Sequence, residues 1–133
     1  MNNNFWPKYI YWELCNHCNL KCKHCFANCE PKKNYFVNIS LLLSKINEIN
    51  QRETVPIRLG GGEPFLYPDI NKVLENCYKC KIPISITTNG TLLDEATIDM
   101  INTYKLETLT ISIDGLQEYN DYLRGKGNFI RAY

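Results

Sequence analysis

Apolar residues follow strand-like and helix-like spacings in turn along this chain. Short runs rich in β-branched and aromatic residues predict four strands, at residues 9–14, 55–59, 82–87 and 108–113. Apolar residues three and four positions apart predict three helices between them, at about residues 39–49, 70–77 and 95–104. Asn38 and Asp94 stand where the N-caps of the first and third helices belong. The segment 15–33 predicts a loop with one short helical turn, and the tail 116–133 predicts another helical turn and the start of a further helix.

The strict alternation of strands and helices predicts an α/β fold. This order implies a parallel sheet with right-handed crossovers, as in part of a β/α barrel or in a doubly wound sheet. Within 82–87 and 108–113, isoleucine and leucine alternate with serine and threonine. One face of such a sheet can pack on helices while the other, small and polar, lines a lumen for a polar ligand. An antiparallel sheet with one wetted face is the alternative, and the intervening helices argue against it.

Length and composition place the chain among ordinary globular proteins. Its 133 residues suit one domain, 44% of them are apolar and 22% are charged. Fifteen Lys and Arg against fourteen Asp and Glu leave a net charge of +1, which excludes strong whole-molecule attraction to nucleic acid or anionic membranes. No apolar run approaches the roughly 20 residues that span a bilayer, and the first residues lack a secretory pattern. We therefore expect a single domain over 1–133, located in the cytoplasm.

Seven cysteines are the unusual feature of the composition, and five of them fall within fifteen residues. These five are Cys15, Cys18, Cys22, Cys25 and Cys29. Such crowding without an export signal favours metal binding over disulfides. The spacing of Cys18, Cys22 and Cys25 lets three thiolates converge on one iron–sulfur cube and leaves its fourth iron open. The alternative is a structural zinc site made of two CxxC pairs, but so short a spacer between the pairs is unusual for zinc.

The remaining cysteines carry weaker signals. Cys15 is expected to be a packed thiol at a strand end. Cys77 lies on the apolar face of the second predicted helix, where cysteine commonly serves as a small hydrophobe. The roles of Cys29 and Cys80 stay open.

The stretch ELCNHCNLKCKHCF, residues 13–26, resembles the signature of radical S-adenosylmethionine (SAM) enzymes. The resemblance continues at the ends of the next three predicted strands, with Gly-Gly-Glu-Pro at 61–64, Thr-Asn-Gly at 88–90 and Ser-Ile-Asp-Gly at 112–115. A later Tyr-Leu-Arg-Gly at 122–125 fits the branch that includes peptide-modifying maturases and cofactor-biosynthesis enzymes. The similarity spans about residues 9–128, and ordered motifs at consecutive strand ends make it specific.

The resemblance implies a partial parallel (β/α) barrel. The usual core of this family has six strands, so the chain is expected to stop after the fourth and to leave that strand as an exposed edge. Such an edge is open to pairing, which makes self-association an expectation. The resemblance also implies two cofactors, a [4Fe–4S] cluster held by Cys18, Cys22 and Cys25, and SAM.

The resemblance further assigns ten residues to SAM binding: Phe26, Gly61, Gly62, Glu63, Pro64, Thr88, Asn89, Ser112, Asp114 and Arg124. Phe26 is expected beside the adenine. The glycines let the backbone approach the ligand, and Glu63 is expected to accept hydrogen bonds from the methionine ammonium. Ser112 and Asp114, on one strand face, would bond the ribose hydroxyls, and Arg124 would meet the methionine carboxylate.

The implied reaction is reductive cleavage of SAM to a 5′-deoxyadenosyl radical that abstracts hydrogen from a substrate. The expected partners are a low-potential electron donor of the flavodoxin or ferredoxin type and a peptide or small-molecule substrate, such as a cofactor precursor. Two alternatives stay open: a small activase that makes a glycyl radical on a partner enzyme, and a non-enzymatic remnant that binds zinc or a cluster. The sequence identifies no residue that touches the substrate.

Overall fold

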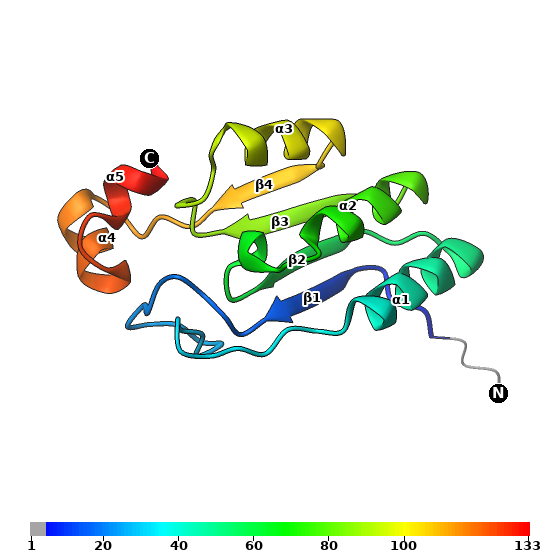
Figure 1. Ribbon diagram of the computed structural model, residues 1–133, viewed down its shortest axis with the longest axis horizontal. Helices are drawn as coiled ribbons and strands as arrows, with labels where there is room; N and C mark the ends of the chain where they lie inside the picture. Colours follow the sequence, from blue (N-terminus) through cyan, green and yellow to red (C-terminus); the bar gives the residue numbers. More distant parts are fainter. Residues whose placement is uncertain (1–4) are drawn as a thin grey trace.

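The computed structural model describes residues 5–133 and contains one four-stranded parallel sheet in the order β1-β2-β3-β4 (Figure 1). The strands are β1 Ile10–Cys15, β2 Ile57–Gly61, β3 Ile84–Thr88 and β4 Thr108–Ile111. The predicted parallel α/β sheet is therefore confirmed. β2 and β3 begin later than predicted because Pro56 and Pro83, which precede them, have no N–H to donate to a ladder. Their carbonyls instead accept hydrogen bonds from Ile10 and Ile57 at 3.0 and 2.9 Å.

The helices are α1 Ile39–Arg52, η1 Pro64–Leu66, α2 Ile70–Lys79, α3 Glu95–Thr103, α4 Gln117–Arg124 and α5 Asn128–Ala132. Both predicted N-caps are confirmed: Asn38 accepts hydrogen bonds from the first turn of α1, and Asp94 accepts one from Thr97 N. Between β1 and α1 the chain forms turns and two isolated bridges, with no helical turn in this described stretch. The short helical turn predicted there is therefore wrong.

The strand order decides between the two sheet types that the sequence left open. A doubly wound sheet reverses its strand order at a switch point, whereas these four strands follow one another in sequence. Right-handed crossovers then place α1, α2 and α3 on one face, as Figure 1 shows. The core lies between that face and the helices, where Leu59 and Ile86 of the sheet are fully buried with Ile46 of α1 and Val73 of α2. This is the arrangement of one side of a β/α barrel.

The opposite face of the sheet is polar. The strand register aligns Tyr11, Arg58, Ser85 and Thr108 in one row across all four strands, and neighbours in register point to the same side. The predicted polar face is thus present, and the apolar residues lie on the side of the helices. β4 ends at Ile111, two residues earlier than predicted. Among residues 5–133 no helix has the length and apolar character needed to cross a bilayer.

Candidate active site at the carboxyl ends of the strands

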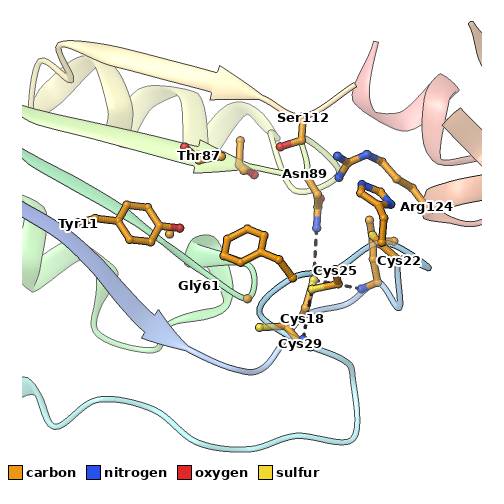
Figure 2. Close-up of a pocket in the computed structure, with 16 residues that line it drawn as sticks. Tyr11, Cys18, Cys22, Cys25, Cys29, Gly61, Thr87, Asn89, Ser112 and Arg124 are labelled. Atoms are coloured by element: carbon orange, nitrogen blue, oxygen red, sulfur yellow. Dashed lines mark hydrogen bonds between the residues drawn. The ribbon is translucent and has the colours of Figure 1, made fainter. Parts of the chain in front are cut away.

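The cysteine loop and the strand-end motifs meet in one pocket at the carboxyl edge of the sheet. Figure 2 shows the 16 residues that line it. Ten of the thirteen predicted site residues are among them: Cys18, Cys22, Cys25, Phe26, Gly61, Gly62, Thr88, Asn89, Ser112 and Arg124. Glu63, Pro64 and Asp114 lie outside the lining. The topology explains this convergence, because the carboxyl ends of parallel strands share one edge of the sheet.

The sulfur atoms in the pocket accept hydrogen bonds from nitrogen donors. Cys18 Sγ accepts one from Leu20 N at 3.4 Å and one from the Asn89 side-chain amide at 3.8 Å. Cys25 Sγ accepts one from Cys29 N at 3.3 Å. Hydrogen bonds of this kind to sulfur tune iron–sulfur sites. The donor set, three thiols with nitrogen donors aimed at two of them, is suited to a soft metal cluster.

Burial favours the neutral form of three thiols in the pocket, those of Cys18, Cys22 and Cys29. Burial raises the pKa of Cys18 to about 11 and that of Cys29 to about 11. Burial also raises the pKa of Cys22, against the opposing charge of Arg124. A bound metal centre supplies the positive charge that deprotonates such thiols. Within residues 5–133, no three His, Cys, Asp or Glu side chains stand at metal-binding geometry.

Glu63 is fully buried and joins two strand ends. Its Oε1 accepts hydrogen bonds from Thr88 Oγ1 at 2.8 Å and Phe65 N at 3.2 Å. Its Oε2 accepts one from Asn89 N at 2.9 Å. Burial raises the pKa of this carboxyl, and the three hydrogen bonds act against the rise. Since a carboxylate accepts about four hydrogen bonds, little capacity is left for a ligand, and contact with the methionine ammonium stays a prediction.

The glycines after β2 are required by the chain's own backbone. Gly61 has a φ of +106°, and a Cβ there would lie 2.6 Å from the Cys15 carbonyl oxygen. A Cβ at Gly62 would collide with the carbonyl of His17. Hydrogen bonds from Gly62 N to Cys15 O at 2.7 Å and from Glu63 N to His17 O at 2.9 Å join the same segments. The glycines therefore let the end of β2 lie directly against the start of the cysteine loop.

Asp114 ties the cysteine loop to α4. Its Oδ2 lies 2.6 Å from Arg124 Nε and 3.2 Å from His24 Nε2. The backbone adds a hydrogen bond from Lys23 N to Leu123 O at 2.8 Å. Because β4 ends before Ser112, the expectation that Ser112 and Asp114 share a strand face is wrong. Ser112 lines the pocket, while Asp114 faces Arg124 and His24, and the ribose contacts stay predictions.

Five further lining residues carry side chains that were not among the predicted site residues: Tyr11, Leu20, His24, Cys29 and Thr87. Thr87 belongs to the polar alternation within residues 82–87, which was the available signal for it. Phe26 lies in the lining but is 87% exposed, so its adenine role stays a prediction. Cys15 is 4% exposed at the end of β1 and Cys77 is fully buried in α2, as expected of packed thiols.

A parallel sheet with three spaced cysteines in a pocket at its carboxyl edge is the combination that comparison with known proteins assigns to a family. The family model of the Radical SAM superfamily matches residues 12–132. The chain belongs to this superfamily, which is a family of enzymes.

Three relatives illustrate the similarity. The subtilosin biosynthesis protein AlbA of Bacillus subtilis is 31% identical over 95% of this chain and 29% of its own length. The Fe-coproporphyrin III synthase of Methanosarcina barkeri is 32% identical over 92% of this chain and 31% of its own length. Among solved structures, Streptococcus suis SuiB bound to S-adenosylmethionine superposes with a TM-score of 0.78 at 25% identity, covering 93% of this chain and 29% of SuiB. SuiB bound to its precursor peptide SuiA gives a TM-score of 0.79 at 27% identity, with 91% and 28% covered. The chain thus spans under a third of the length of these relatives.

Proposed function

We propose that this chain binds a [4Fe–4S] cluster through Cys18, Cys22 and Cys25 and binds SAM in the same pocket. When bound, the cluster would supply the electron that cleaves SAM reductively to methionine and a 5′-deoxyadenosyl radical, which abstracts hydrogen from a substrate. The observation that carries this proposal is the gathering of three spaced thiols and three strand-end motifs in one pocket. Superfamily membership over residues 12–132 supports it.

The residues of the chain would bind, orient and shield the cofactors. The amides that point at Cys18 and Cys25 would stabilise the thiolate form of these ligands. Asn89 is itself held by Glu63, so the carboxylate would act as a positioning residue for the pocket wall. Arg124, 12% exposed in its side chain, places a guanidinium on the pocket where a carboxylate of SAM would be paired.

The proposed SAM site contains the same residues that the sequence predicted for SAM binding. Gly61 and Gly62 contribute backbone, Pro64 begins η1 and stiffens the turn, and Phe26 stands at the rim for the adenine. Thr88 and Asn89 form one wall. Ser112 and Asp114 are proposed for the ribose hydroxyls.

We further propose a peptide or a cofactor precursor as the substrate. AlbA is a bacteriocin biosynthesis protein, SuiB was solved with a precursor peptide, and another relative is a porphyrin synthase. The required electron would come from a low-potential donor of the flavodoxin or ferredoxin type. Seven free cysteines among the described residues favour a reducing compartment, and we propose the cytoplasm. The chain would form the amino-terminal portion of a barrel, and the edge strand β4 is the proposed place of any self-association.

The test is anaerobic reconstitution with iron and sulfide followed by incubation with SAM and dithionite. We expect a brown protein that releases 5′-deoxyadenosine. Replacing Cys18, Cys22 or Cys25 by Ala should abolish both the iron–sulfur absorption and the nucleoside. Cys80→Ala, a partly exposed cysteine of the α2 end, is the matched control and should keep both. A colourless protein, or zinc bound by the same cysteines, would refute the proposal.

A further inference from the structure

The open face of the sheet, opposite α1 to α3, carries a cation in its central row. Arg58 lies in the middle of β2 with Tyr11 on one side and Ser85 on the other. Arg58 is half-buried, and its Nε is fully buried and has no hydrogen-bond partner. Among residues 5–133, no acidic side chain comes within salt-bridge distance of Arg58, and its side chain makes no hydrogen bond.

This lack of a partner is physically unusual. A buried N–H of a charged group that finds no acceptor destabilises the protein that carries it. Arg124, the arginine that lines the pocket, is by contrast paired with Asp114 at 2.6 Å. Glu13, an exposed residue further along β1, is the one acidic residue within the four strands, and it forms no ion pair with Arg58. Among residues 5–133, the charge of the Arg58 guanidinium on the open face is therefore not neutralised by an acidic side chain.

Arg58 is connected to the proposed cofactor pocket through Tyr11. Tyr11 pairs with Arg58 in the strand register, yet its ring lies over Gly60, and its hydroxyl end contacts the place where a Gly60 Cβ would be. Tyr11 lines the pocket together with Gly60 and Gly61, and Figure 2 shows its ring reaching along the sheet toward the cysteines. Two residues along a strand cover about 7 Å. A ligand anchored at Arg58 would thus extend past Tyr11 to the pocket.

We propose that Arg58 is a substrate-binding residue that pairs with a carboxylate of the substrate on the open face. The inference rests on the proposed function, because it takes the pocket as the place of reaction. The planar guanidinium fork binds a carboxylate through two parallel hydrogen bonds. A carboxylate fits better than a phosphate, since this row offers a single cation and Glu13 on the same strand face repels a doubly charged group.

The test reads the N–H signals of the arginine side chains by NMR. The sequence has four arginines, Arg52, Arg58, Arg124 and Arg131, so the Nε signal of Arg58 can be assigned with Arg58→Lys. The probe is a blocked glycine pentapeptide with a central glutamate, and the same peptide with glutamine is its control. We expect the glutamate peptide to shift the Arg58 signal in a saturable way, while the glutamine peptide and the Arg52 and Arg131 signals show no change.

The variants give the second readout. Arg58→Gln should weaken binding of the glutamate peptide about tenfold or more, Arg58→Lys should weaken it less, and the exposed Arg131→Gln should keep it. Propionate and inorganic phosphate are further probes. Binding of propionate as tight as the peptide would assign the site to a free carboxylate, and weaker binding would assign it to a peptide side chain. Preference for phosphate, equal effects of both peptides, or unchanged affinity in Arg58→Gln would overturn the proposal.

The titration is made on the full chain after reconstitution and repeated without iron. Its readout does not depend on cleavage of SAM. A chain that releases no 5′-deoxyadenosine but binds the glutamate peptide through Arg58 would refute the proposed function and support this site. A chain that cleaves SAM but shows no shift of the Arg58 signal would support the proposed function and refute the carboxylate site at Arg58.

Discussion

Glu63 accepts a hydrogen bond from Asn89 N at 2.9 Å, although the two residues follow different strands. Asn89 in turn directs its side-chain amide at Cys18 Sγ. A buried carboxylate thus connects the end of β2, the end of β3 and the cysteine loop. This connection leads to the first two predictions.

Replacing Glu63 by Gln should destabilise the fold. The new amide nitrogen faces either Thr88 Oγ1 and Phe65 N or Asn89 N, so at least one donor loses its acceptor in a site of 0% exposure. A buried unsatisfied donor costs about 1–3 kcal/mol. Urea unfolding of the variant, compared with Glu53→Gln at an exposed position, measures this cost. Equal free energies of unfolding for the two variants would contradict the structural role of Glu63.

Replacing Asn89 by Ala should lower the reduction potential of the reconstituted cluster. The variant removes a donor from Cys18 Sγ, and hydrogen bonds to sulfur favour the more electron-rich reduced state. A hydrogen bond of about 1 kcal/mol corresponds to a shift on the order of tens of millivolts. An anaerobic redox titration followed by electron paramagnetic resonance measures it. Asn102→Ala on the exposed face of α3 is the control, and a potential that stays the same in Asn89→Ala would argue against the Cys18 contact.

Replacing Gly62 by Ala should destabilise the fold more than replacing a glycine whose only special feature is a left-handed backbone conformation. A Cβ at Gly62 meets the backbone carbonyl of His17, so the cysteine loop must move away from β2. Such overpacking costs about 1–3 kcal/mol or more. Gly127 has a φ of +78° with nothing within 4 Å of an added Cβ, so Gly127→Ala reports backbone strain alone, about 1–2 kcal/mol. We expect Gly62→Ala alone to lose cluster incorporation, measured as iron per chain after reconstitution.

Cys77 should make stability fall at alkaline pH. Burial in the core raises the pKa of its thiol to about 12, above the value near 9 of an exposed cysteine. Between these values the folded state holds a proton that the unfolded state has released, so the free energy of unfolding decreases as pH rises. The decrease from this group is about 2 kcal/mol between about pH 9 and pH 10.5, at roughly 1.4 kcal/mol per unit.

The measurement is urea unfolding across this pH range, taken as the difference between the native chain and Cys77→Ala. Cys80→Ala, in the same CxxC pair but only partly buried, corrects for the other groups that titrate there. The difference in free energy of unfolding between the native chain and Cys77→Ala should become smaller as pH rises. A gap between the two chains that is constant with pH would contradict the burial of Cys77.

The sequence alone determined the α/β class, the alternation of elements, two helix caps and the motifs at the strand ends. These features depend on local spacing, on capping chemistry and on where parallel strands end, all of which are visible in one dimension. The prediction that Cys15 and Cys77 are packed thiols succeeded for the same reason, because each lies at an apolar position of a regular element.

Only the tertiary structure decided which polar groups face one another. Three sets of contacts join residues of different elements. Glu63 accepts hydrogen bonds from Thr88 and Asn89, Asp114 pairs with Arg124 and His24, and Gly62 lies against His17. Strand spacing does not reveal them, since their distances depend on register and on the path of an irregular loop. Arg58 shows the opposite situation, a polar group that faces no partner among the described residues. Its residue type is visible in the sequence, but the lack of a partner for its buried Nε is a property of the folded face around it.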